Sequence, residues 1–213
     1  MAAHRREPMA SSQKKPPKWL QTPELPVLHA GVDEAGRGAL AGDVVAAAVI
    51  LAPSSSIEGL DDSKKLTPAH RESLYDAILK QCACFAIGRA SPDEIDRLNI
   101  LRASLLAMRR AVEQLEIEPE SVLVDGNFLP DWTYPAKAIP GGDGKIQAIA
   151  AASILAKVTR DREVTALDQA YPHYHFPQHK GYPTPAHLKA LATHGPTPHH
   201  RQTFGPVAKL AIT

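Results

Sequence analysis

Short apolar runs alternate with helix signals along the first half of the chain. Two Val/Ala-rich runs, at residues 27–33 and 44–51, flank the Gly-rich stretch GRGALAG, so we expect two strands joined by a turn. The Thr-Pro pair that opens residues 67–80 is typical of an N-cap followed by the first helical position, which predicts a helix there. A third strand is predicted at residues 82–90.

The middle of the chain continues the mixture of strands and helices. Ser91 and Glu94 have the spacing of a capping box before a short helix. Residues 101–115 carry apolar side chains at the spacing of an amphipathic helix. Compact strands are expected at residues 121–125 and near residues 136–139.

The longest predicted helix extends over about residues 145–170. Its first half, IQAIAAASILA, is apolar on nearly all sides, which predicts burial. Residues 171–213 are rich in Pro and His and contain one clear helix, which begins at Thr184 and Pro185 and ends at Gly195.

Strands mixed with helices throughout predict an α/β fold. We expect a catalytic core at residues 27–170, a C-terminal helical segment at residues 171–213, and a flexible, basic and Pro-rich tail at residues 1–26. The tail lacks the apolar region of a secretory signal, while a mitochondrial-type presequence remains open. No apolar run approaches the roughly 20 residues that a membrane helix needs. We therefore expect a cytoplasmic protein.

Composition restricts how the chain can bind nucleic acid. It has 24 basic and 23 acidic side chains, for a formal net charge of +1. A protein held to nucleic acid by diffuse charge alone is usually more basic, so any such binding must come from locally placed charge. Cys82 and Cys84 are interpreted as two reduced thiols on an apolar strand, because this pair alone would leave half of a tetrahedral zinc site unfilled.

Acidic residues stand at the ends of predicted strands and in a nearby loop. Asp33 and Glu34 close the first strand, Asp125 closes a later one, and Asp143 lies just before the long helix. Converging carboxylates repel each other, and Mg²⁺ or Mn²⁺ relieves that repulsion because these ions prefer hard oxygen ligands. Four carboxylates around two such ions suit in-line phosphoryl displacement. Ordinary turn chemistry remains an alternative for Asp125, which precedes Gly126, and for Asp143 among its glycines.

Other polar residues are candidates for contacts with a substrate. Gly36 and Gly38 let a ligand approach the backbone, and Arg37 between them can pair with a phosphate, although turn geometry alone also explains such glycines. Ser153, Lys157 and Arg160 recur at helical spacing, so their side chains form a polar stripe that can reach phosphates.

Two alternatives concern the basic and imidazole side chains. For Arg160 and Arg162, a solvated helix end with ordinary ion pairs to Asp161 or Glu163 is an equal alternative to a phosphate contact. The late histidines have irregular spacing, which favours surface positions over a zinc site; they are His173, His175, His179, His194, His199 and His200.

Six motifs, in order, closely resemble the ribonuclease HII family. They extend from about residue 28 to residue 207 and are GVDEAGRGALAGDVVAAAVIL, DSKKL, VDGN, GGDGK…AAASILAKVTRDR, HKGYPT and HHRQTFGPV. The resemblance implies an RNase H-like mixed β-sheet flanked by helices, with a C-terminal helical segment that completes the substrate site. It implies an endoribonuclease of ribonucleotide excision repair and DNA replication.

The implied reaction is hydrolysis of the RNA strand of RNA–DNA hybrids, with cutting 5′ of single ribonucleotides embedded in duplex DNA. It uses two ions, Mn²⁺ or Mg²⁺, and leaves 5′-phosphate and 3′-hydroxyl ends. A monomer suffices, and binding to a sliding clamp is left open.

The resemblance also assigns roles residue by residue. The residues that match the acidic metal site are Asp33, Glu34, Asp125 and Asp143. The element that senses the ribose 2′-hydroxyl is matched by Gly36, Arg37 and Gly38. Tyr182 matches a tyrosine that packs against the deoxyribonucleotide following the scissile linkage. Positions along the nucleic-acid strands are matched by Ser63, Lys64 and Lys157.

Some features depart from the family pattern. Ala39 and Asp43 stand where prolines are expected, and Asp43 adds a carboxylate near the site. HHRQTFGPV is a looser match, so no site residue is assigned from it. Two other functions remain: a related RNase H-like nuclease with another substrate, such as a junction resolvase, and a catalytically silent hybrid-binding module. A requirement for the 2′-hydroxyl separates the first, and the presence of all four acids disfavours the second.

Overall fold

The computed structural model describes residues 28–53 and 55–212. The tail expected at residues 1–26 lies outside the described residues. Within the described part, no helix is long and apolar enough to cross a membrane.

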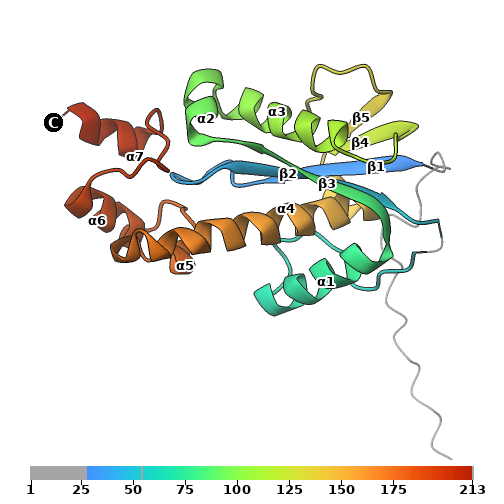
Figure 1. Ribbon diagram of the computed structural model, residues 1–213, viewed down its shortest axis with the longest axis horizontal. Helices are drawn as coiled ribbons and strands as arrows, with labels where there is room; N and C mark the ends of the chain where they lie inside the picture. Colours follow the sequence, from blue (N-terminus) through green and yellow to red (C-terminus); the bar gives the residue numbers. More distant parts are fainter. Residues whose placement is uncertain (1–27, 54, 213) are drawn as a thin grey trace, which may run out of the picture.

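Five strands form one mixed sheet in the order β3-β2-β1-β4-β5 (Figure 1). β1 (His29–Ala35) pairs antiparallel with β2 (Val44–Leu51), which pairs antiparallel with β3 (Cys82–Ala90). On its other side β1 runs parallel to β4 (Ser121–Asp125), and β4 runs parallel to β5 (Ala136–Ile139). The carboxyl ends of β1 and β4 therefore meet at one edge of the sheet.

Helices cover both faces of the sheet. On one face lie α2 (Pro92–Leu98) and α3 (Ile100–Glu113), and on the other lie α1 (Pro68–Gln81) and α4 (Gln147–Ala166) (Figure 1). Neighbouring residues of a strand face opposite sides, so each face of β2 packs into its own core.

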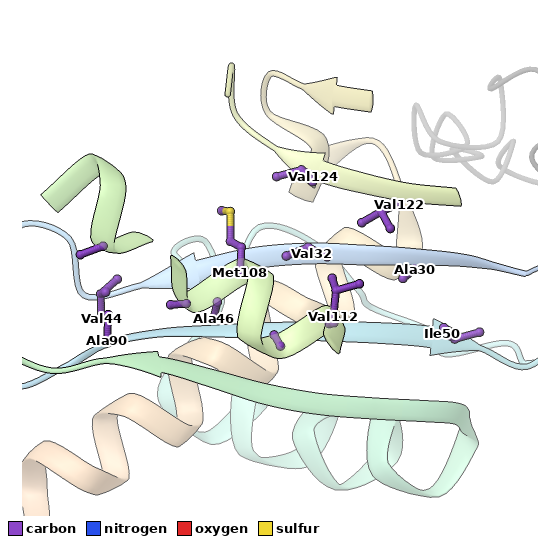
Figure 2. Packing of buried hydrophobic residues seen from close by; sticks show 14 of the residues in the cluster. Ala30, Val32, Val44, Ala46, Ile50, Ala90, Met108, Val112, Val122 and Val124 are labelled. Atoms are coloured by element: carbon purple, nitrogen blue, oxygen red, sulfur yellow. The ribbon is translucent and has the colours of Figure 1, made fainter. Parts of the chain in front are cut away.

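The two cores divide the strand residues between them. Ala46 packs with Met108 and Val112 of α3 in one core (Figure 2), while Ala47 packs with Ile154 of α4 in the other. This double coverage explains why β2 is apolar along its whole length.

The backbone of α4 lies directly against β1. A Cβ on Gly31 would stand 2.1 Å from the carbonyl carbon of Ala148, so only glycine permits this approach. The contact fixes the start of α4 beneath the strand that carries Asp33 and Glu34.

The C-terminal residues form several short helices around a small apolar cluster. They are η4 (Pro172–Tyr174), α5 (Phe176–His179), α6 (Pro185–His194), α7 (Gly205–Ala208) and η5 (Lys209–Ile212). Tyr174 and Phe176 pack with Val164 of α4 and with Leu40, so this segment is continuous with the rest of the molecule. The boundary drawn at residue 170 stays a prediction.

Two predicted boundaries were wrong. β1 continues to Ala35, so Asp33 and Glu34 lie inside the strand, where their backbone still pairs with Ala47 and Ala46. The long helix ends at Ala166, and residues Leu167–Gln169 form a 3₁₀ turn, η3. There the chain tightens into 3₁₀ geometry, with the Ala170 amide donating to the Leu167 carbonyl at 3.1 Å, as is common at helix ends.

Local capping signals were accurate. Thr67 and Thr184 cap α1 and α6, and the capping box of α2 forms through Ser91 and Glu94. The mixed sheet flanked by helices, with further helices at the C-terminus, is present as expected.

Candidate active site

One cavity of about 530 Å³ opens at the carboxyl ends of β1 and β4. It gathers nearly all of the predicted site residues, and its lining includes Asp33, Glu34, Gly36, Arg37, Gly38, Ser63, Lys64, Asp125, Lys157 and Tyr182. These residues come from five separate motifs, which the fold brings to one place. Asp143 is the one predicted site residue outside the lining.

Asp33 is the most deeply placed acid of the cavity, with 6% of its surface exposed. Burial raises the pKa of Asp33 well above its usual range, and the neighbouring charges of Glu34 and Asp125 raise it further. Burial also raises the pKa of Glu34, although Arg37 opposes that shift. The fold thus holds carboxylates together against a cost in free energy.

Asp125 and Asp143 approach each other through a short turn. The Gly142 amide donates to Asp125 Oδ1 at 2.7 Å, and Asp143 follows in the 3₁₀ turn η2 (Gly142–Gly144). Burial raises the pKa of Asp143, and the next cause is the charge of Asp125. Asp143 is therefore within electrostatic reach of the other acids.

The donor chemistry of this cluster fits a hard divalent cation. Its acids offer only carboxylate oxygens, and Mg²⁺ and Mn²⁺ prefer such ligands. Arg37 pairs with Glu34 at 3.2 Å, but its side chain is 51% exposed and can swing away. Among the described residues, no three acids, histidines or cysteines already enclose an ion. The donor chemistry therefore fits a cation, while the side chains do not form a ready-made set of ligands.

The Gly-rich turn lies beside Tyr182. Gly36 has a φ of 97°, which strongly favours glycine, and a Cβ on Gly38 would stand 3.9 Å from Tyr182 Cε1. The Ala39 amide donates to the Gly36 carbonyl at 3.3 Å, a bond that the expected proline cannot make. Burial raises the pKa of Asp43, the other departure from the family pattern.

Three further predicted residues line the same cavity. Ser63 is buried, and its hydroxyl accepts a hydrogen bond from Ser153 at 2.8 Å. Burial alone would lower the pKa of Lys64, but nearby carboxylates, Asp62 first among them, raise it overall. Lys157 donates to Asp161 at 2.8 Å, and its ammonium lies 5.4 Å from the centre of the Tyr182 ring.

Arg160 is 0% exposed, so neither a phosphate contact nor a solvated helix end describes it, although its Nη1 lies 4.0 Å from Asp161 Oδ1. Its guanidinium donates to three backbone carbonyls, those of Ala41 (3.0 Å), Asp43 (3.2 Å) and Lys180 (3.0 Å). It also lies 5.3 Å from the centre of the Tyr182 ring. Arg160 therefore ties helix α4 to the segments on either side of the cavity. Arg160 lies four residues after the buried Ala156 and four before the buried Val164, so all three share one face of α4. This spacing is the signal that indicates burial.

Arg201 is a second buried arginine, and sequence analysis missed it. It donates to the Gly42 carbonyl at 2.8 and 3.0 Å and to the Arg37 carbonyl at 3.0 Å. The C-terminal motif HHRQTFGPV therefore supports the backbone of the Gly-rich turn through Arg201. Because this motif matches the family only loosely, the sequence did not indicate a role for Arg201.

The expectation of surface positions was wrong for His179 and His200, and a further late histidine, His187, is buried with them. His179, His187 and His200 are 6%, 0% and 1% exposed. They are buried because Tyr174 and Phe176 pack around them. In the described part of the chain, these histidines do not belong to any cluster suited to a metal ion.

Comparisons with known proteins show which family the chain is similar to. The family model described as Ribonuclease HII matches residues 30–207. A Ribonuclease HII of Shewanella amazonensis is 60% identical over 178 residues, which cover 84% of this chain and 86% of the relative. A Ribonuclease HII of Coxiella burnetii is 58% identical over 186 residues, covering 87% and 92%.

Solved structures show the same fold. Ribonuclease H2 from Pyrococcus horikoshii superposes with a TM-score of 0.73 at 29% identity, covering 85% of this chain and 96% of that one. RNase HII of Archaeoglobus fulgidus, solved in a complex with PCNA, gives a TM-score of 0.62 at 27% identity over 83% and 95%. A Bst-RNase HIII in complex with Mn²⁺ shares the fold at 19% identity, with a TM-score of 0.64 over 87% and 70%. The family match and the curated relatives together establish that the chain belongs to the ribonuclease HII family of endoribonuclease H enzymes.

Proposed function

We propose that this chain hydrolyses the RNA strand of RNA–DNA hybrids and cuts 5′ of single ribonucleotides embedded in duplex DNA. The products would carry 5′-phosphate and 3′-hydroxyl ends. One observation carries the proposal: Asp33, Glu34 and Asp125 share a single cavity with the Gly36–Gly38 turn and the Tyr182 ring. Acids suited to metal ions thus face groups suited to a sugar.

Asp33, Glu34, Asp125 and Asp143 would hold two divalent cations, Mg²⁺ or Mn²⁺. When bound, such ions activate a water and stabilise the leaving oxygen of a phosphodiester. The raised pKa values of Asp33, Glu34 and Asp143 support this assignment, because a cation removes the repulsion and compensates for lost hydration.

The Gly36–Gly38 turn and Tyr182 would select the ribonucleotide-to-deoxyribonucleotide junction. A glycine backbone lets a ribose approach closely, so peptide groups can bond its 2′-hydroxyl, which distinguishes RNA from DNA. The Tyr182 ring would pack against the sugar of the next, deoxy, nucleotide. A Cβ on Gly38 would lie 3.9 Å from Tyr182 Cε1, and this closeness supports contacts of the two elements with neighbouring nucleotides.

Ser63, Lys64 and Lys157 would lie along the strands. The carboxylates around Lys64 raise its pKa, so its ammonium stays charged at neutral pH and can pair with a phosphate. One chain supplies the whole candidate site, so a monomer suffices. Because the Archaeoglobus relative was solved with PCNA, a sliding clamp is the first partner to test.

Cleavage of a duplex with one ribonucleotide tests the proposal. The labelled duplex is incubated with Mg²⁺ or Mn²⁺, and product ends are mapped at nucleotide resolution. We expect one cut, 5′ of the ribonucleotide, and no cut in a matched all-DNA duplex.

Three results would contradict the proposal. Cutting that ignores the 2′-hydroxyl would indicate a related nuclease with another substrate, such as a junction resolvase. Tight binding without cleavage in either metal would indicate a hybrid-binding module. Absence of both binding and cleavage would refute the assigned substrate.

A further inference from the structure

A pair of buried histidines, His187 and His200, lies behind Tyr182 and outside the cavity lining. Their Nε2 atoms are 3.0 Å apart. The partners of the other ring nitrogens assign the protons of both rings. His200 Nδ1 accepts from the Thr197 amide at 3.0 Å, so its proton is on Nε2.

His187 is oriented in the complementary way. Its Nδ1 lies 3.0 Å from the carbonyl oxygen of Tyr182, which can only accept, so His187 Nδ1 carries the proton. Its Nε2 is then free to accept from His200 Nε2. One continuous chain of donors runs from Thr197 through His200 and His187 to the backbone of Tyr182, and every bond in it needs neutral imidazoles.

The main chain around His200 is fixed to the segment that follows the Gly-rich turn. His200 and Ala41 form an isolated antiparallel β-bridge. Two backbone hydrogen bonds of 2.9 Å flank it, from the Gly42 amide to the His199 carbonyl and from the Arg201 amide to the Leu40 carbonyl. The Arg201 side chain also holds the Arg37 carbonyl. The main chain of His200 is thereby attached to the Gly36–Gly38 turn. Its ring reaches Tyr182 through His187.

We infer that His187 and His200 are positioning residues, which hold Tyr182 in register with the Gly36–Gly38 turn only while both rings are neutral. This inference rests on the proposed function, since it concerns how that site selects a junction. A merely structural role would affect all substrates alike, whereas the positioning role predicts a selective loss at the junction.

The surroundings of the pair oppose protonation. Burial, together with the neighbouring His187, His199 and His179, lowers the pKa of His200 to about 4. Burial likewise lowers the pKa of His187, against which the His179 ring stacks at 4.3 Å. The centre of the Tyr174 ring lies 5.0 Å from that of His200. Its hydroxyl donates to the Gly195 carbonyl, so Tyr174 offers no negative charge that would stabilise a protonated imidazole.

The sign of the pH effect follows from these lowered pKa values. Above the ordinary histidine pKa of about 6.5, the neutral rings fully support the position of Tyr182 beside the Gly36–Gly38 turn. That support is lost as pH falls from 6.5 toward 4. Protonation of His187 would place an N–H on each of the two Nε2 atoms that face each other.

Substitution of His200 tests the positioning role. We compare kcat/KM for a single-ribonucleotide duplex with kcat/KM for a continuous RNA–DNA hybrid, whose internal linkages offer no junction. At pH 8, His200→Leu should lower this ratio on the order of tenfold, because a misplaced Tyr182 loses alignment. His200→Gln should keep the wild-type ratio, because its amide still donates to His187. The exposed residue His194 supplies a control, and His194→Leu should change nothing.

The pH profile of the same ratio is the second arm. Protonation of the carboxylates in the cavity should lower kcat/KM for both substrates by the same factor. That effect therefore cancels in the ratio. The wild-type ratio should fall as pH is lowered from about 6.5 toward 4, while the His200→Gln ratio should stay flat, because the amide can rotate and accept from protonated His187. A pH-independent wild-type ratio, or a folded His200→Leu protein with the wild-type ratio, would overturn the inference.

Imidazole ¹⁵N NMR separates failure of this inference from failure of the proposed function. The wild-type spectrum should show both rings neutral, each with one fixed tautomer, at pH 6. A protonated imidazole at pH 6 would refute the positioning role of His187 and His200, even if the enzyme were active. Absence of cutting at pH 8 with neutral, fixed rings would instead contradict the proposed function.

Discussion

Buried polar side chains, each with distant partners, hold the cavity wall in place. Arg160 is the clearest case, because three carbonyls from two different segments depend on its guanidinium. Removing it leaves those buried acceptors without donors, and each such loss destabilises a fold.

We expect Arg160→Met to lower the free energy of unfolding by about 3 kcal/mol, since the carbonyls lose their partners. Urea unfolding followed by circular dichroism measures this change. Arg162→Met is the matched control on the same helix, because Arg162 makes an exposed ion pair with Glu72 that should contribute less than about 1 kcal/mol. Equal losses in the two variants would refute the structural role of Arg160.

Asp33 illustrates the opposite situation, a buried side chain whose charge costs stability. Without metal, Asp33→Asn should raise the free energy of unfolding by about 1 kcal/mol or more, because it removes a desolvated charge beside Glu34 and Asp125. Denaturant unfolding in a metal chelator checks this. Asp131→Asn, an exposed change, should leave stability unaltered. A destabilised Asp33→Asn protein would contradict the electrostatic account.

At the scale of elements, the closeness of α4 and β1 determines where the acids lie. Gly31→Ala would place a methyl group 2.1 Å from a backbone carbon of α4, so strand and helix must separate. We expect a loss of about 3 kcal/mol in the free energy of unfolding, together with lower activity. Gly205→Ala, where a Cβ meets nothing within 4 Å, is the control. A neutral Gly31→Ala protein would mean that the two elements tolerate separation.

Element types and caps were predictable from the sequence because they depend on local patterns. Thr67 and Thr184 cap helices as their neighbours indicate. The end of β1 was misplaced, because its last residues pair with β2 despite their charge, and pairing with another strand is invisible in local periodicity. Arg160 was misassigned for a similar reason: one of its carbonyl partners, Ala41, lies 119 residues away.

The candidate site was predictable in content but not in detail. Motif resemblance supplied the acids, the Gly-rich turn and Tyr182, and all of these except Asp143 line one cavity. The supporting residues Arg201, His187 and His200 carried no signal that distinguished them from surface basic residues. Their roles depend on contacts between distant segments, which only the folded chain reveals.

For the whole molecule, metal binding should couple to stability and to pH. Asp33 and Glu34 have raised pKa values, so without metal their contribution is present below the unfolded values, about 3.8 and 4.5, and is lost as pH rises through the folded ones. If cations bind the ionised carboxylates as proposed, they should restore stability at higher pH. At one hundred times the dissociation constant the gain is about 2.7 kcal/mol.

We therefore expect saturating Mn²⁺ to raise Tm by about 5–10 °C at pH 8 and by much less at pH 5. Differential scanning fluorimetry with Mn²⁺, Mg²⁺ and a chelator measures this shift. Asp125→Asn should abolish most of it. A shift of equal size at both pH values would indicate that the ions bind elsewhere.

The most direct test of the central claim is the cleavage rate of four neutralised variants, Asp33→Asn, Glu34→Gln, Asp125→Asn and Asp143→Asn, on the single-ribonucleotide duplex with saturating Mn²⁺. If these acids jointly hold the catalytic ions, each variant should keep its fold yet lose on the order of a thousandfold in rate, while Asp131→Asn cuts normally. A folded Asp33→Asn or Asp125→Asn protein that cuts at the wild-type rate would contradict the account.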